Sequence, residues 1–321
     1  MRAFITGASG FIGGHLSAHL VQNEWHVRAL VHSRKITGPD NIETVQGDIR
    51  NEKLIKDALR DVDVVFHLAS ALGAAQIKKK EFFEVNAQGT RTVLEAGLAA
   101  GIKRVVHYSS AGVLGHVEPG LVADENYPLD PQDIYDQSKL EGENIALDFA
   151  RRGLDVVIIR PGWVYGPGDR RTFKLVRSIE RRRFILVSKG RTLQTPVYIA
   201  DLIQGTMLCT EKGRRGEIYN LAGPEVLTVK QIAETIASVC GKKIPRPELP
   251  LLPVKAAAWM LGKSFSFFRK EAPLTPARLS FFIHPKPLSI RKAAGLGFLP
   301  ETDFRNGMEQ TVAWYREAGW L

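Results

Sequence analysis

Tyr135 and Lys139 are four positions apart in the segment YDQSK, which places their side chains on one face of a helix. A phenol titrates at about pH 10 and is a poor base at neutral pH, but a neighbouring ammonium group lowers its pKa. The pair could therefore exchange a proton with a substrate oxygen. Because this spacing also occurs by chance, it needs support from the residues around it.

Two serines, Ser109 and Ser110, follow the apolar run KRVVHY. If that run is a strand of a parallel sheet, they lie at its carboxyl end, where ligands of such sheets bind. A hydroxyl there could hold a substrate oxygen while Tyr135 moves the proton. The alternative is that both serines only satisfy the backbone of a turn.

Three glycines, Gly7, Gly10 and Gly13, recur at three-residue steps in TGASGFIGG, between an apolar run over 2–5 and a helical pattern over 12–21. This spacing permits a tight turn, close approach of the backbone to a phosphate, and close packing of helix on strand. Free N–H groups at the start of the helix favour an anion. A structural turn without a ligand is the alternative, and the neighbouring elements decide between the two.

Strand-like runs alternate with helical patterns up to residue 161. The runs are HVRALVH, IETVQGD, VDVVFHLAS, KRVVHYSS and LDVVIIRP, and helices are expected over EKLIKDALRD, VNAQGTRTVLEAGLAAG and SKLEGENIALDFARR. Apolar strands that alternate with helices predict an α/β fold, a doubly wound parallel (Rossmann) sheet, here with a smaller C-terminal α/β substrate lobe. We expect a dinucleotide-binding domain over 1–168, to which 192–224 return, and a substrate-binding lobe over 169–191 and 225–321. The glycine loop then lies at the first turn of a dinucleotide-binding sheet.

The composition, 44% hydrophobic and 24% charged over 321 residues, is that of an ordinary globular protein. The first apolar run begins almost at Met1, and no apolar run reaches the roughly 18 residues of a membrane span, so we expect a cytoplasmic protein. Cys209 and Cys240 lie far apart within apolar helical patterns. They are expected to be buried thiols that form neither a disulfide framework nor a metal site.

The net charge of +10 is unevenly distributed, since 1–150 contain 15 Lys and Arg against 20 Asp and Glu, whereas 151–321 contain 29 against 14. Arg170, Lys174, Arg177 and Arg181 recur on one face of a predicted helix. A solvated face, attraction of an anionic ligand and contact with an anionic membrane surface all remain open. No nucleic-acid-binding module accompanies the charge, so nucleic acid is not expected as a partner. A homodimer also remains open.

The glycine loop, the serines and the Tyr-Lys pair, in this order, resemble the extended short-chain dehydrogenase/reductase family of NAD(P)-dependent epimerases and dehydratases. In appearance the chain is most similar to the 3β-hydroxysteroid dehydrogenase and dihydroflavonol reductase branch. The resemblance covers nearly the whole chain, through TGASGFIG, GDI, HLAS, VNAQGT, SSAGV, YDQSK, RPGWVYGPGD, VYIADL, YNLAG and AWYREAG. It implies that Ser110 polarises the substrate oxygen, Tyr135 transfers its proton, and Lys139 lowers the pKa of the phenol and binds the nicotinamide ribose.

The resemblance also implies a dinucleotide site. The pyrophosphate would lie against Gly7, Ser9, Gly10, Phe11, Ile12 and Gly13. Adenine would be flanked by Asp48 and Ile49, the ribose and phosphate side by Leu68, Ala69 and Ser70, and the nicotinamide end by Pro161, Gly162, Trp163 and Val164. Asn86 would lie near the reacting centre, with Tyr135 and Lys139. For Asn86 and Ser70 a helix cap is the alternative role.

The residues after the second strand favour NADP. NAD-selective folds of this kind end that strand with an acid that binds the ribose hydroxyls. Here Val31 occupies the acid's place, and His32, Ser33, Arg34 and Lys35 follow. A basic cluster attracts the 2′-phosphate that an acid would repel, so we expect NADP, with NAD and a merely solvated turn as alternatives. The dihydroflavonol reductases that the chain resembles have arginine in place of His32, and Arg34 is expected to substitute for it.

Several family features of nucleotide-sugar enzymes are missing. Family 4,6-dehydratases have an Asp-Glu pair where this chain has Ala111 and Gly112. Nucleotide-sugar enzymes tend to have a diphosphate-binding arginine where this chain has Gln194. They also commonly have an asparagine in the segment that here reads RPGWVYG. The C-terminal lobe is instead rich in apolar side chains, which either pack in a core or suit a flat, lipid-like substrate. These are Trp259, Met260, Phe265, Phe267, Phe268, Phe281 and Phe282.

We therefore expect an NADP(H)-preferring oxidoreductase that interconverts a secondary alcohol and a ketone on an apolar steroid-, flavonoid- or lipid-like substrate. Hydride would pass between the substrate carbon and nicotinamide C4, without a metal ion. Two alternatives remain open. One is a nucleotide-sugar epimerase, whose basic half would meet the diphosphate. The other is a non-catalytic dinucleotide-sensing protein, which would not need Ser110, Tyr135 and Lys139 together.

Overall fold

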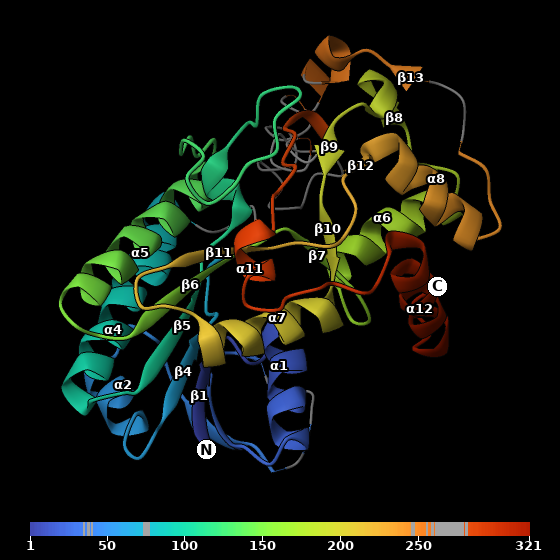
Figure 1. Ribbon diagram of the computed structural model, residues 1–321. Helices are drawn as coiled ribbons and strands as arrows, with labels where there is room; N and C mark the ends of the chain where they lie inside the picture. Colours follow the sequence, from blue (N-terminus) through green and yellow to red (C-terminus); the bar gives the residue numbers. More distant parts are fainter. Residues whose placement is uncertain are drawn as a thin grey trace.

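The computed structural model describes residues 1–34, 36, 39, 41–72, 78–244, 248–254, 256–257, 260, 279 and 282–321. Within them the chain folds around a seven-stranded parallel sheet with helices on both faces (Figure 1). Its strands in spatial order are β11 (Ile218–Leu221), β6 (Val156–Pro161), β5 (Arg104–Tyr108), β4 (Val64–His67), β1 (Arg2–Thr6), β2 (His26–Val31) and β3 (Glu43–Gln46). The predicted doubly wound α/β fold is confirmed.

Two apolar layers hold the helices on the sheet. On one face lie α2 (Glu52–Ala58), α4 (Gly89–Ala100) and α5 (Ile134–Arg151), and on the other lie α1 (Phe11–Gln22) and α7 (Ile199–Lys212) (Figure 1). Strand residues alternate between the layers, with Phe4 on the α4 side and Ile5 on the α1 side. Burial on both faces explains why the central strands β1, β4, β5 and β6 are largely apolar, whereas the edge strand β3 is mostly exposed.

The chain order reverses in the middle of the sheet. From β1 the chain proceeds outward through β2 and β3, and it returns to the other side of β1 for β4, β5 and β6. Ligands of such sheets bind beyond the carboxyl ends of the strands at this reversal. The connection from β4 to β5 runs through α3 (Lys79–Phe83) and a π-helix, η1 (Glu84–Gln88), which leads directly into α4.

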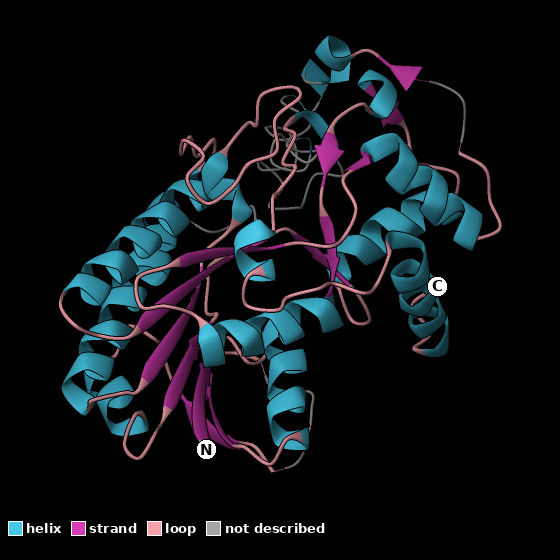
Figure 2. Ribbon diagram, viewed as in Figure 1, coloured by secondary structure: helices cyan, strands magenta, loops and turns pink. Residues whose placement is uncertain are grey.

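A second group of elements lies beyond the carboxyl ends of the sheet (Figure 2). Its helices include α6 (Arg170–Glu180), α8 (Val229–Val239) and α12 (Phe304–Glu317), and short helices η2 (Ala111–Leu114) and η3 (Ser188–Gly190) lie in loops. The short helix α11 (Arg291–Ala294) instead packs against β11 of the main sheet. Its strands pair two by two: β7 (Trp163–Tyr165) with β10 (Pro196–Tyr198), β9 (Leu193–Gln194) with β12 (Leu227–Thr228), and β8 (Leu186–Val187) with β13 (Glu248–Leu249). After β10 and α7 the chain returns to the main sheet as β11.

Polar side chains begin the helices of this second group. Asp169 accepts hydrogen bonds from the backbone N–H groups of Arg171 and Thr172 at the start of α6. Thr228 and Gln231 form a reciprocal capping box on α8. Cys209 and Cys240 are buried free thiols, as predicted. No helix of the described part of the chain is long and apolar enough to cross a membrane.

Candidate active site

The parallel sheet gathers the predicted site residues at one edge. The glycine loop follows β1, His32 follows β2, Asp48 follows β3, Ser70 follows β4 and Ser110 follows β5. Residues 161–164 lie at the end of β6, and α5 and η1 supply the remaining side chains. Residues that are distant in sequence therefore share one region because parallel strands end on the same side.

The glycine loop has steric reasons for two of its glycines. Gly7 has a φ of +78°, and a Cβ there would lie 2.7 Å from the backbone nitrogen of Ala69. A Cβ on Gly13 would lie 2.3 Å from the carbonyl oxygen of Gly7. The helix that follows begins after Gly10 without a side-chain cap, and no hydroxyl or carboxylate of the described residues bonds to its first N–H groups.

Asn86 ties the loop after β4 to α5. Its Oδ1 accepts hydrogen bonds from the Ser70 hydroxyl at 3.1 Å and from the backbone N–H of Ala71 at 2.7 Å, and its Nδ2 donates to the Ser138 hydroxyl at 2.8 Å. It lies inside the π-helix and caps no helix, so the capping alternative for Asn86 is wrong. The residue instead positions Ser70 beside the helix that carries Tyr135.

Three hydroxyl groups meet at the end of β5. The hydroxyls of Ser70 and Ser110 lie close enough to the phenol of Tyr135 to lower its pKa. The Ser110 oxygen also accepts from the backbone N–H of Gly112 at 2.9 Å, which fixes it at the start of η2. The structure thus brings together the predicted pair of Ser110 and Tyr135 and adds Ser70, which was expected only beside the ribose.

The charge environment of the phenol differs from the expectation. Burial raises the pKa of Tyr135, and this outweighs the lowering by the Arg171 guanidinium and by the two serine hydroxyls. The Lys139 ammonium was expected to lower this pKa, but its Nζ donates to the carbonyl oxygen of Tyr108 and it is not among the groups that act on the phenol. In this structure Tyr135 is therefore a neutral phenol at physiological pH.

Lys139 is itself buried and perturbed. Burial lowers its pKa to about 8, against the opposing pull of the Glu143 carboxylate one turn further along α5. Glu143 is held in a buried ion pair with Arg160 of β6, with Nη2 and Oε1 2.5 Å apart. Burial also lowers the pKa of His67 on β4 to about 3, so this ring below the site is neutral.

Asp136, which sequence reasoning passed over, brings a carboxylate to the Ser110 loop. A Cβ on Gly112 would lie only 1.7 Å from its Oδ1, so this acid occupies the place where a side chain at 112 would begin. Its Oδ2 lies 3.8 Å from the Nζ of Lys286, and burial raises its pKa to about 6. Ala111 and Gly112 carry no acid, but the next helix supplies one. Its sequence signal was its position directly after Tyr135.

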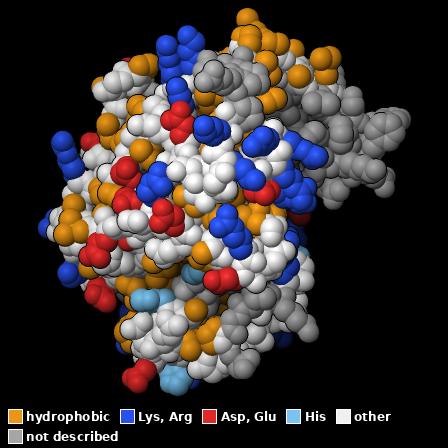
Figure 3. All heavy atoms as spheres, turned by 90° about the vertical axis from the view of Figure 1, so that its right-hand side faces the viewer, with side chains coloured by type: hydrophobic (Ala, Val, Ile, Leu, Met, Phe, Trp, Pro, Cys, Tyr) orange, Lys and Arg blue, Asp and Glu red, His pale blue; other side chains and the backbone are white. Residues whose placement is uncertain are grey.

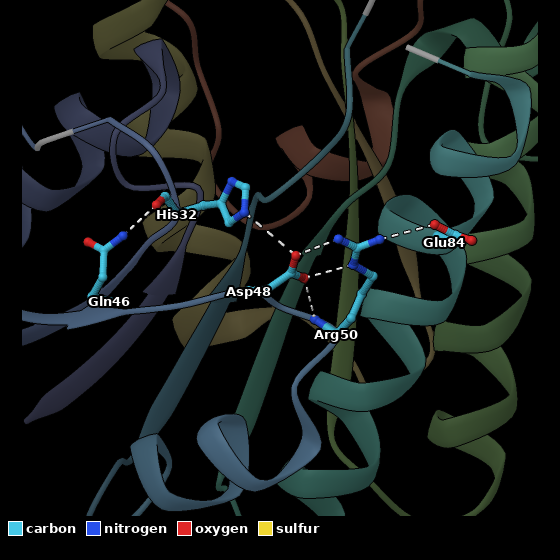
Figure 4. Close-up of polar contacts among 5 residues, drawn as sticks. All are labelled: His32, Gln46, Asp48, Arg50 and Glu84. Carbon is cyan, nitrogen blue, oxygen red and sulfur yellow. Dashed lines mark hydrogen bonds and ion pairs between the residues drawn. The ribbon is translucent and has the colours of Figure 1, made fainter.

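The expected adenine end is organised by a charge cluster (Figure 4). Asp48 accepts from the backbone N–H, Nε and Nη2 of Arg50, at 2.9, 2.9 and 2.6 Å, and the Arg50 side chain lowers the pKa of Asp48 to about 2. Arg50 also donates to Glu84 at 3.0 Å, and the exposed His32 ring lies 3.6 Å from Asp48. Sequence reasoning missed Arg50, although the spacing Asp-x-Arg could have indicated the contact.

The predicted nicotinamide end lies between the main sheet and the C-terminal segment. A Cβ on Gly162 would lie 2.5 Å from the carbonyl oxygen of Thr195, so the two segments of the chain pass in close contact. Trp163 packs its ring 5.9 Å from that of Phe304. Gln194, which stands where nucleotide-sugar enzymes of the family tend to have an arginine, donates to the carbonyl oxygen of His284 at 3.0 Å. At least this part of its amide is committed to the backbone.

The comparison with known sequences identifies the family. The profile of the NAD dependent epimerase/dehydratase family matches residues 3–222. The chain belongs to this family. It is a member of the extended short-chain dehydrogenase/reductase group and an NAD(P)-dependent enzyme of that type, which disfavours the dinucleotide sensor.

Relatives of different activities align over almost the full chain. A 4-hydroxy-2-methyl-3-oxo-4-farnesyl-3,4-dihydroquinoline-1-oxide ketoreductase of Stigmatella aurantiaca is 28% identical, covering 96% of this chain and 95% of its own. Sterol demethylase protein B of Methylococcus capsulatus is 30% identical and covers 100% of both chains. The crystal structure of a dTDP-glucose 4,6-dehydratase of Streptomyces venezuelae with NAD and TYD bound has a TM-score of 0.80 and 26% identity, covering 100% of this chain and 98% of that one.

The dinucleotide that the family uses fits the residues present. The uncapped start of α1 and the two crowded glycines provide N–H donors and room for a pyrophosphate. The buried hydroxyl of Ser109 has no hydrogen-bond partner among the described residues, so a polar group near the end of β5 remains unsatisfied. Ile49 is buried against Gly89 of α4, whereas Ser9, Phe11, Ile12, Leu68 and Val164 are partly exposed around the loop ends.

The apolar residues expected to shape the substrate lobe are only partly described. Trp259, Phe265, Phe267, Phe268 and Phe281 lie outside the described residues. Of the others, Met260 is 56% exposed, and the Phe282 ring packs 6.0 Å from that of Phe184.

Proposed function

We propose that this family member is an NADP(H)-preferring oxidoreductase that interconverts a secondary alcohol and a ketone on an apolar steroid-, flavonoid- or lipid-like substrate. The observation that carries the proposal is the meeting of the Ser70, Ser110 and Tyr135 hydroxyls at the end of β5, with Lys139 one turn along α5. Residues 1–168 with 192–224 would bind the cofactor, and 169–191 with 225–321 would bind the substrate.

In this mechanism the bound nicotinamide supplies or accepts the hydride. Tyr135 transfers a proton between its phenol oxygen and the substrate oxygen, and Ser110 donates a hydrogen bond to the same oxygen. Ser70, held by Asn86, keeps the phenol oriented between transfers. Lys139, freed from the Tyr108 carbonyl, would bind the nicotinamide ribose and then stabilise the phenolate by its charge.

The substrate class is supported by two relatives and by the chain's own residues. The Stigmatella relative is named for a farnesyl-bearing ketone, and the Methylococcus relative for sterol demethylation. Gln194 has a neutral amide where an arginine guanidinium could bind a diphosphate through two N–H groups. This makes a substrate with a diphosphate less favoured. Apolar substrates of this kind partition into membranes, so we also propose, as a separate point, contact with an anionic membrane surface.

The NADP preference is supported by the basic end of the adenine region. Arg34 is exposed and makes no ion pair within the described residues, so its guanidinium is available for a 2′-phosphate. Arg50 neutralises Asp48, whose charge would otherwise repel that phosphate. His32 lies within 3.6 Å of the same carboxylate, which places it at this end of the site.

The test is turnover of NADPH with a panel of sterols, flavonoids, short ketones and UDP-sugars, followed by variants. Tyr135→Phe removes the proton-transferring hydroxyl but keeps the ring, so turnover should fall about 100-fold or more with little change in NADPH affinity. Ser110→Ala should lower turnover alone, and Lys139→Ala should damage both turnover and NADPH binding. Tyr219→Phe is the matched control, since its phenol accepts a backbone N–H remote from the site. Near-normal turnover of Tyr135→Phe would refute the mechanism.

A nucleotide-sugar epimerase is the second candidate, and the position of Arg171 favours it. This exposed cation is close enough to the Tyr135 phenol to lower its pKa, so it could attract a diphosphate to the site. UDP-glucose and dTDP-glucose are nevertheless expected to be neither epimerised nor dehydrated. Product detection by chromatography after long incubation would reverse the choice between the two functions.

A further inference from the structure

A concave basic surface lies on the C-terminal lobe, along α6 and the end of the chain. Its cavity has a volume of about 740 Å³. The cavity is lined by Arg170, Phe173, Lys174, Arg177, Ser178, Arg181, Arg183 and Trp320. We call it the α6 cavity. The four cations predicted on one helical face thus line a hollow, and Arg183 adds a fifth.

Aromatic rings form part of the wall of the α6 cavity, and two of its five cations lie over such a ring. The Arg170 guanidinium lies 5.6 Å from the centre of the Trp320 ring, and that of Arg177 lies 5.8 Å from the Phe173 ring. The Trp320 ring in turn stacks on the buried Tyr315 at an interplanar angle of 9°. A guanidinium that is held over a ring loses less conformational freedom when it binds an anion.

The charge of this cavity is of one sign. No carboxylate side chain is among its lining residues in the described part of the chain, and all five cations are exposed or partly exposed. Figure 3 shows Lys and Arg side chains gathered on the face that carries α6, α8 and α12. A concave surface lined by cations alone concentrates their electric field. Such a surface attracts anions, above all those with several charges.

An exposed apolar edge continues from the cavity. Two residues after Arg183, the Ile185 side chain is 45% exposed, and the next residues form β8, which pairs with β13. Within β13, Leu249 is 39% exposed, and three residues further along the chain Leu252 is 80% exposed. Hydrophobic side chains are also visible at the top of the same face in Figure 3. Basic side chains beside exposed leucine and isoleucine are typical of surfaces that dock on lipid bilayers.

We propose that this face is a docking site for an anionic phospholipid surface, with the α6 cavity binding lipid phosphate groups and the edge of Ile185, Leu249 and Leu252 entering the interface. The apolar edge is what favours a bilayer over a soluble anion or a nucleic acid, because neither of those would cover it. Arg171 is adjacent to the cavity residue Arg170, and its charge lowers the pKa of the Tyr135 phenol. Docking through the cavity would therefore hold the active-site end of α6 near the membrane.

The experiment measures sedimentation of the full chain with phosphatidylcholine vesicles that contain or lack phosphatidylglycerol. Binding should require phosphatidylglycerol and weaken with added salt. Arg177→Glu/Arg181→Glu should weaken it about 30-fold or more, since each cation at an anionic surface contributes about fivefold. Leu252→Ser should weaken it by about tenfold through the lost apolar contact. Lys53→Glu/Lys56→Glu on α2 is the charge-matched control and should bind like the unaltered chain.

NADPH affinity, measured on the same samples, checks that the variants are folded and should not change. Equal binding to both kinds of vesicle, or equal weakening by the α2 control, would overturn the proposal. So would binding of pyrophosphate or a DNA fragment at the α6 cavity without any binding to vesicles. The docking proposal accompanies the apolar-substrate proposal but is measured without substrate, so either can fail while the other holds.

Discussion

Replacement of Asp136 by asparagine should change how the stability of the protein depends on pH. The Asp136 side chain is 9% exposed, its carboxylate packs on Gly112, and its nearest cation is Lys286 at 3.8 Å. Asparagine has nearly the same shape and carries no charge. Asp136→Asn therefore removes the charge of the carboxylate at neutral pH while keeping its packing.

The magnitude follows from the shift in acidity. Burial, aided by the nearby charge of Asp133 and opposed by Lys286, raises the pKa of Asp136 from 3.8 to about 6. The folded protein thus binds this proton more tightly than the unfolded chain. The resulting stabilisation is complete below about pH 3.8 and is lost as the pH rises through about 6. A shift of this size corresponds to about 3 kcal/mol of unfolding free energy.

The assay is urea unfolding at a series of pH values from about 4 to about 7.5. Near the acidic end Asp136 is protonated and, like asparagine, carries no charge. There Asp136→Asn and the unaltered protein should unfold at similar urea concentrations. Above pH 6 the variant should become the more stable by about 3 kcal/mol. Asp57→Asn, at a half-exposed carboxyl on α2, is the control and should follow the unaltered protein. If the profiles of Asp136→Asn and the unaltered protein run parallel, Asp136 does not titrate as argued.

Three further outcomes concern the cofactor. NADPH should bind about tenfold more tightly than NADH, roughly 1.4 kcal/mol, and Arg34→Ala should remove most of this preference in calorimetry; equal affinities would contradict it. Arg50→Ala leaves Asp48 without its neutralising partner, so it should weaken NADPH more than NADH in the same titrations. Gly13→Ala places a Cβ 2.3 Å from the Gly7 carbonyl oxygen, so it should reduce the affinity for both dinucleotides. The affinities are measured by fluorescence titration, and unchanged values would show that the loop relaxes.

The sheet and the central site residues could be predicted because their signals are local. Apolar runs bounded by turns locate strands, and the spacing of Tyr135 and Lys139 alone places them on one helix face. Once the strands are parallel, their carboxyl ends coincide, so Ser110 after β5 must lie near the glycine loop after β1. The parallel topology therefore predicts that these residues lie close together, which no single segment of the sequence indicates.

The contacts that tune the site could not be predicted, because they join side chains across the fold. Asp136 meets Gly112 on another element and Lys286 from the far end of the chain, and no local pattern records either contact. The direction of the pKa shift of Tyr135 was predicted wrongly for a similar reason. The sequence shows an ammonium one turn away but not the desolvation that raises the pKa of the phenol, nor that the ammonium is bonded to the Tyr108 carbonyl.

This arrangement of charges bears on the direction of proton transfer. With its pKa raised by burial, the Tyr135 phenol holds its proton at neutral pH, and the Asp136 carboxylate adds to that effect. A protonated phenol beside the Ser110 hydroxyl is suited to donate to a ketone oxygen as negative charge develops there. Oxidation of an alcohol would first require the phenolate, which a repositioned Lys139 ammonium would have to stabilise. In the proposed mechanism, this protonated phenol is the form of the site that ketone reduction requires.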